Sequence, residues 1–181
     1  MWKPLPVSWQ KGAIKVDVIS AAKEIRMAIR QGDLDQVRNI IEFDHDALNI
    51  ITPFGTWLHV AASMGRLDIL KYFINCGLDP NIEAGTFNAG AINIAAAEGH
   101  IEIVEYLLSC GARMDISEPD HNPLFAAIYG GHKDIVKLLL DNGIDPSVSY
   151  SGDYMKNMDA YAFALERGQK EIAEMLIPCK K

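Results

Sequence analysis

An Ala followed four residues later by a Gly recurs five times along this chain, about every 33 residues. A period of this length corresponds to one supersecondary unit, which cannot bury its apolar face alone and must stack on its neighbours. The pattern therefore predicts a solenoid, an architecture whose extended surface binds other macromolecules. The pairs are Ala28/Gly32, Ala61/Gly65, Ala95/Gly99, Ala127/Gly131 and Ala164/Gly168.

The second unit predicts a pair of helices. Thr56 is suited to cap a short helix, and Gly65 can end that helix because glycine adopts the left-handed conformation without strain. A second helix is expected from Leu67 to about Asn75, where apolar residues at helical spacing form one stripe. Similar stripes precede Gly111 and Gly143. The chain is therefore expected to be an all-α stack of helix pairs.

Specific motifs resemble those of a known family. Residues 56–65 read Thr-Trp-Leu-His-Val-Ala-Ala-Ser-Met-Gly, similar to the Thr-Pro-Leu-His-x-Ala-Ala-x-x-Gly signature of ankyrin repeats. Residues 99–104 and 131–136 resemble the Gly-His-x-Glu-Ile-Val that opens the second helix of these repeats. The resemblance covers about residues 20–177. It implies an ankyrin-repeat solenoid of stacked helix-turn-helix units with hairpin-like finger loops.

The units depart from the family pattern at the start of the first helix. The Thr and His of the signature occur together only in the second unit, so the hydrogen bonding implied for them is expected only around His59. Asn122 and Asp159 can still cap the corresponding helices of later units. We assign structural roles to His59 and to the Gly-His residues His100 and His132.

The repeat pattern also predicts the domain organisation. Residues 1–19 form an N-terminal arm, which either folds back over the first repeat or binds a partner. Residues 20–181 form a single ankyrin-repeat domain whose first and last repeats act as caps, and two caps favour a monomer. An insertion around residues 148–158 predicts an elongated finger. The approximate repeats are 20–49, 50–82, 83–116, 117–149 and 150–181.

Charge and cysteine usage restrict the kind of partner and the compartment. A formal net charge of −7 argues against nucleic-acid binding, which relies on clustered Lys and Arg, and favours a basic protein. The sequence has no apolar run long enough for a membrane span and no signal peptide at its start, so we expect a cytoplasmic protein. Cys76 and Cys110 occupy equivalent places in neighbouring units, about 10 Å apart, which is too far for a disulfide.

No set of residues in the sequence predicts catalysis. A nucleophile, base and orienting acid cannot be assembled, and there is no glycine-rich phosphate loop. His45 and His121 lie in connections beside acidic residues, but a metal role for either needs ligands from another loop. We therefore expect a non-enzymatic protein without a cofactor or a metal.

The family resemblance implies that the fingers and the exposed edges of the first helices bind a partner protein. Tyr150 and Tyr154 are expected to be contacts rather than core residues. Phe54 and Phe87 either contact the partner or attach fingers to the stack, and Trp57 is expected to be half exposed, with either a packing or a binding role. The candidate binding residues are Phe54, Trp57, Met64, Phe87, Glu98, Glu118, Asp120, His121, Tyr129, Tyr150, Asp153, Tyr154, Met155 and Arg167.

Several functions fit such a module. The acidic charge favours a bacterial immunity protein that neutralises a basic toxin by covering it. The alternatives are a general adaptor, a regulatory inhibitor of an enzyme or transcription factor, and an effector secreted into a host cell. A neighbouring toxin gene would support the first hypothesis, and many weak partners would support an adaptor.

Overall fold

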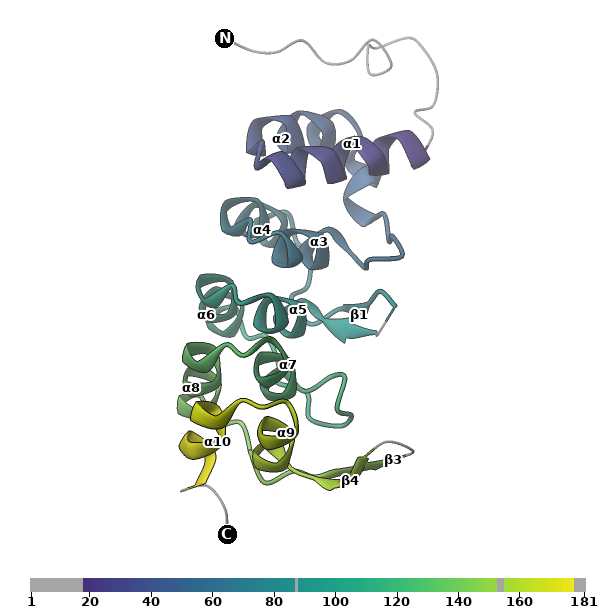
Figure 1. Ribbon diagram of the computed structural model, residues 1–181. Helices are drawn as coiled ribbons and strands as arrows, with labels where there is room; N and C mark the ends of the chain where they lie inside the picture. Colours follow the sequence, from purple (N-terminus) through teal and green to yellow (C-terminus); the bar gives the residue numbers. More distant parts are fainter. Residues whose placement is uncertain (1–17, 87, 153–154, 178–181) are drawn as a thin grey trace.

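The computed structural model describes residues 18–86, 88–152 and 155–177. Figure 1 shows the helices stacked in two rows, with α1, α3, α5, α7 and α9 in one row and the even-numbered helices in the other. The predicted all-α solenoid is therefore confirmed. Its helix pairs are α1 (Val18–Gln31) and α2 (Leu34–Phe43), α3 (Trp57–Ser63) and α4 (Leu67–Asn75), α5 (Ala91–Glu98) and α6 (Ile101–Ser109), α7 (Pro123–Gly130) and α8 (Lys133–Asp141), and α9 (Ala160–Glu166) and α10 (Lys170–Leu176).

Finger loops connect successive pairs and project on the side of the odd-numbered helices (Figure 1). The first finger follows a 3₁₀ helix, η2 (His45–Asn49), and closes through two backbone hydrogen bonds between Thr52 and Gly55. The second pairs β1 (Glu83–Ala84) with β2 (Ala89–Gly90). The third is the loop between α6 and α7, residues 110–122. The fourth pairs β3 (Tyr150–Gly152) with β4 (Met155–Met158), as the insertion in the sequence predicts.

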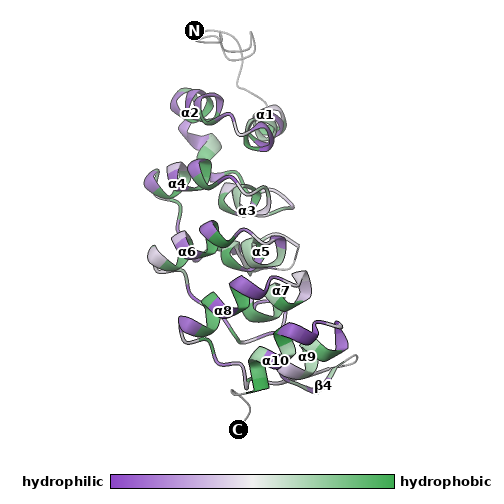
Figure 2. Cartoon of the chain, turned by 60° about the vertical axis from the view of Figure 1, so that its left-hand side comes forward, coloured by the Kyte–Doolittle hydropathy of each residue, from purple (hydrophilic) through white to green (hydrophobic). Residues whose placement is uncertain are grey.

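The repeated Ala residues lie where adjacent pairs meet. Ala28 is 2% exposed, and its four equivalents from Ala61 to Ala164 are fully buried. We call the odd-numbered helices the inner helices and the even-numbered helices the outer row. A methyl side chain lets neighbouring inner helices approach closely, so the core is continuous along the stack. In Figure 2, α7 is hydrophobic along most of its length, whereas α8 carries both colours because its outer face meets solvent.

The histidines of the Gly-His motif connect one unit to the next. His132 Nε2 donates a hydrogen bond to the carbonyl of Ala97 at 2.9 Å, and His100 Nε2 lies 3.3 Å from the carbonyl of Ser63. The His132 ring also covers Gly99, which has a φ of 83°, and a Cβ at Gly99 would lie 2.5 Å from that ring. The structural role expected for these two histidines is thus confirmed.

His59 stabilises the start of α3 and the second finger. Its Nδ1 accepts a hydrogen bond from the Thr56 backbone N–H at 3.2 Å and lies 2.8 Å from Thr56 Oγ1. Its Nε2 lies 2.9 Å from the Ala89 carbonyl, which can only accept. The neutral imidazole protonated on Nε2 satisfies all three partners. Asn122 and Asp159 cap α7 and α9, as expected.

This arrangement predicts a pH dependence of stability. Burial lowers the pKa of His59 below its usual value, against a smaller opposing effect of the hydrogen bond to Ala89. Because the unfolded chain then binds the proton more readily than the folded protein, stability should fall as the pH drops below about 6.5. Urea unfolding at pH 7.5 and pH 5 should show this loss. The His59→Gln variant, which keeps an acceptor but does not titrate, should lose less; equal losses in both proteins would contradict the assignment.

The boundary between the N-terminal arm and the first repeat differs from the sequence expectation. Val18 and Ile19, assigned to the N-terminal arm, form the first turn of α1. Residues 1–17 of that arm lie outside the described residues, so the two alternative roles of the arm stay predictions.

Cys76 and Cys110 are free thiols, in agreement with the expected absence of a disulfide between them. Among the described residues, none of the helices has the length and apolar character that crossing a membrane requires.

Candidate protein-binding groove

A groove of about 610 Å³ runs across the inner helices and beneath the fingers. Its floor comes from the edges of α5, α7 and α9 that face away from the outer row. Small side chains, such as Ala97 and Ala126, line the groove on the side of the helices, and residues of the finger loops line its other side. The residues that line it include Pro53, Phe54, Ser63, Thr86, Ile94, Ala97, Glu98, Asp120, Phe125, Ala126, Tyr129, Met155 and Phe163.

The part of the floor formed by α7 and α9 is aromatic. The Phe125 and Phe163 rings stack at 4.8 Å with an angle of 17° between their planes. Tyr150 packs its ring edge against Phe125, with the centroids 5.1 Å apart. Phe125 is almost fully buried, so these contacts hold the floor rigidly.

Two exposed aromatic side chains from different repeats line the groove. Tyr129 on α7 is 62% exposed, and the Arg167 guanidinium lies 4.1 Å from its ring centroid. Phe54 at the tip of the first finger is 59% exposed, with Arg26 at 5.4 Å from its ring. Exposed aromatic residues beside an apolar cleft are typical of binding hot spots.

The first two fingers are held against each other. Thr86 Oγ1 donates a hydrogen bond to the Pro53 carbonyl at 3.3 Å. Gly85, with a φ of 82°, lies so close to the first finger that a Cβ would be 3.2 Å from the Phe54 backbone. Phe54 is therefore presented on a supported loop, and its ring remains available to a partner.

Acidic side chains border the apolar floor. Glu98 at the end of α5 and Asp120 in the third finger both line the groove, and both are exposed. Glu118 lies in the same finger as Asp120 and is also exposed. An apolar floor with an acidic border is complementary to a partner with apolar and basic side chains.

The structure brings some of the sequence candidates to the groove and leaves others elsewhere. Phe54, Glu98, Asp120, Tyr129 and Met155 line it, and Arg167 reaches it through the Tyr129 ring. Met64 packs partly against the core. Phe87, Asp153 and Tyr154 lie outside the described residues.

Trp57 corrects one expectation. It was expected to be half exposed, but it is fully buried, and its indole N–H donates a hydrogen bond to the Ala47 carbonyl at 2.8 Å. A side chain as large as Trp at the start of α3 fills the space between that helix and η2, where the family's Pro would leave it open. A fully buried side chain offers no surface to a partner.

The position of Tyr150 also differs from the sequence expectation. It was expected to be difficult to place in a core, yet its ring packs on the core and its hydroxyl is fully engaged. The hydroxyl donates to the Ile116 carbonyl at 2.8 Å and accepts from Asn122 Nδ2 at 2.9 Å. Burial, with the nearby charges of Asp115 and Glu118, raises the pKa of Tyr150 against the opposing effect of Asn122. Tyr150 therefore connects the fourth finger to the third.

Several groove residues were missed in the sequence. Ile94, Ala126 and Phe163 lie three or four residues before the selected positions Glu98, Tyr129 and Arg167. Residues three or four apart on a helix share a face, so helical spacing contained a signal for them. On the first helices, the candidates were taken only from the positions next to each anchor Gly.

The comparison with known families agrees with this geometry. A family model described as ankyrin repeats (3 copies) matches residues 25–118 and again residues 92–181, so the chain belongs to the ankyrin-repeat family. The fold is therefore that of a protein–protein interaction module, and the family is generally non-enzymatic. No curated protein matches the chain.

Proposed function

We propose that this protein binds one partner protein in the groove between the finger loops and the inner helices. The observation that carries the proposal is an apolar floor lined by two exposed aromatic side chains, Phe54 and Tyr129. The proposal further assigns Glu98, Asp120 and Met155 to the contact surface, with Arg167 holding the Tyr129 ring.

The partner is proposed to be a basic protein. The net charge of −7 and the acidic border support this, because opposite charges accelerate association and orient the partner. The same charge argues against nucleic acid as the ligand. We further propose a monomer in the cytoplasm without a cofactor or a catalytic activity; the free thiols of Cys76 and Cys110 are consistent with a reducing compartment.

A narrower proposal is a bacterial immunity protein that covers a basic toxin. It rests on the acidic charge alone. A general adaptor, a regulatory inhibitor or a secreted effector would use the same groove and differ only in the partner. Capture from the native lysate with the wild-type chain as bait would distinguish them, since one abundant basic protein supports a dedicated inhibitor and a diffuse set supports an adaptor.

The groove is tested by the Tyr129→Ala variant. Loss of an aromatic hot-spot contact costs about 2 kcal/mol or more, so the dissociation constant for the captured partner should rise about 30-fold. Titration calorimetry with the purified partner would measure it.

Tyr106→Ala is a matched control. Tyr106 lies on the outer helix α6 and carries a similar cation contact, with Lys71 Nζ at 5.0 Å from its ring centroid. Its loss should leave the affinity unchanged. Equal weakening by both variants, or by neither, would move the binding surface away from the groove.

A further inference from the structure

A second cavity lies beside the fingers and is separate from the groove. It has a volume of about 400 Å³ and lies between the second and third fingers. Of the residues that line it, only Asn93 also lines the groove. The protein-binding proposal therefore makes no use of this cavity, although its walls are built from neighbouring fingers.

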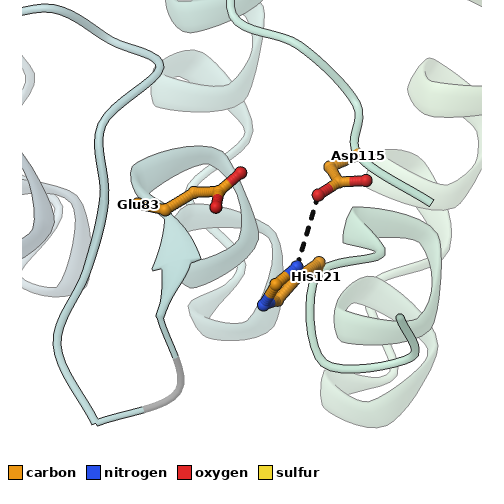
Figure 3. Close-up of side chains that lie close together, drawn as sticks. All are labelled: Glu83, Asp115 and His121. Carbon is orange, nitrogen blue, oxygen red and sulfur yellow. Dashed lines mark hydrogen bonds and ion pairs between the residues drawn. The ribbon is translucent and has the colours of Figure 1, made fainter. Parts of the chain in front are cut away.

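Three side chains with metal-binding atoms converge in this cavity. They are Glu83 from β1 and Asp115 and His121 from the third finger, and one ligand atom from each lies within 4.8 Å of the others. Figure 3 shows the Glu83 carboxylate reaching from its strand toward the gap between Asp115 and His121. A metal at His121 was not expected from the sequence, because it needs a ligand from another loop; Glu83 of the neighbouring finger is such a ligand.

The distance between two of these atoms suits a shared metal ion. Asp115 Oδ2 and His121 Nδ1 are 3.3 Å apart, longer than a typical N–H···O hydrogen bond of about 2.9 Å. Two ligands at about 2.0–2.1 Å from a tetrahedral Zn²⁺ lie about 3.3 Å from each other. The pair can thus bind a metal with little movement. Glu83 is exposed, so its side chain can rotate to become the third ligand.

The surrounding groups prepare Asp115 to act as a ligand. Hydrogen bonds from the Ser117 backbone N–H and hydroxyl, at 2.8 Å and 3.1 Å, hold its carboxylate in place. Both Asp115 oxygens are thus oriented within the cavity, with Oδ2 facing His121 Nδ1. Arg113 also lines the cavity, but the two carboxylates outweigh its single positive charge.

We propose that Glu83, Asp115 and His121 form a binding site for a divalent transition-metal ion, with Zn²⁺ as the best match. An imidazole with two carboxylates is a ligand set for Zn²⁺ rather than for Mg²⁺ or Ca²⁺, which take oxygen ligands alone. Three protein ligands leave a fourth position for water. The ion would join two consecutive fingers, adding to the hydrogen bonds between Asn81 and the backbone of Gly111 and Arg113.

Calorimetric titration of the tag-free, reduced, metal-free full chain with ZnCl₂ tests this site. We expect one ion per chain and a rise in Tm with added Zn²⁺, because a ligand that binds only the folded state stabilises it. His121→Ala should weaken the affinity at least about ten-fold. Glu83→Gln, an exposed change that does not threaten folding, should also weaken it.

His45→Ala is the matched control, because His45 stands between Asp44 and Asp46 but is exposed and, among the described residues, belongs to no group of three metal-binding side chains. It should bind Zn²⁺ like the wild type. The proposal would be overturned if the wild type failed to bind Zn²⁺, if His121→Ala bound it equally well, or if Ca²⁺ or Mg²⁺ bound more tightly.

Discussion

Replacing Ala95 with Arg is expected to unfold the middle of the stack, at a cost of about 4 kcal/mol or more. Ala95 is fully buried on α5, which packs against α3 on one side and α7 on the other. A guanidinium there would have no room among close-packed side chains and no buried counterion. In a solenoid each unit is stabilised mainly by its neighbours, so a lesion in a central unit removes support from both halves.

Urea unfolding followed by circular dichroism would measure this loss. Glu98→Arg is the matched control, since Glu98 lies on the same helix but is exposed, and its replacement should change stability by about 0.5 kcal/mol or less. Hydrogen exchange should show the largest loss of protection in α3, α5 and α7. Wild-type stability in the Ala95→Arg protein would mean that the five Ala residues do not form the contact between units.

The fold could be predicted from the sequence because the solenoid repeats one local problem. Each unit needs a cap, a small residue at the contact, a glycine at the turn and an apolar stripe, and all four lie within about 33 consecutive residues. The second helix of the second unit was predicted from Leu67 to about Asn75, which are the bounds of α4. Such local signals do not depend on knowing which distant segments meet.

The groove was predictable only in part. Glu98 and Tyr129 could be selected because their distance from an anchor Gly fixes the face of the helix on which they lie. The packing of Trp57 and Tyr150 could not be predicted, because it depends on η2 and on the carbonyl of Ile116, neither of which has a sequence signature. Trp57 had been left open between packing and binding and is fully buried, whereas Tyr150 had been expected to contact a partner and instead packs partly on the core.

The cluster of Glu83, Asp115 and His121 could not be predicted from a single unit, because its residues come from two successive units. Glu83 and Asp115 are separated by about one repeat length, so stacking places them side by side although neither has metal-ligand spacing along the chain. In a solenoid, sites of this kind arise between residues one period apart. An alignment of each unit with the next predicts that the acidic side chain of one finger lies near the histidine of the following finger.

The Trp57→Ala variant is expected to destabilise the N-terminal end of the stack by about 3–5 kcal/mol. Trp57 is among the largest fully buried side chains, and its removal leaves a cavity between α3 and η2. It also leaves the Ala47 carbonyl without its indole partner, which adds the cost of a buried acceptor. The pair α1 and α2 contacts the rest of the protein through this region, so it should open first.

Hydrogen exchange on the folded variant would locate the effect. Protection should fall most in α1, α2 and η2 and least in α9 and α10, because coupling in a solenoid weakens with each intervening unit. The Trp57→Phe variant, which keeps most of the apolar volume but not the indole N–H, should lose only about 1–2 kcal/mol. A uniform loss of protection along the chain would show that the stack unfolds as a single unit and that Trp57 does not specifically anchor the first repeat.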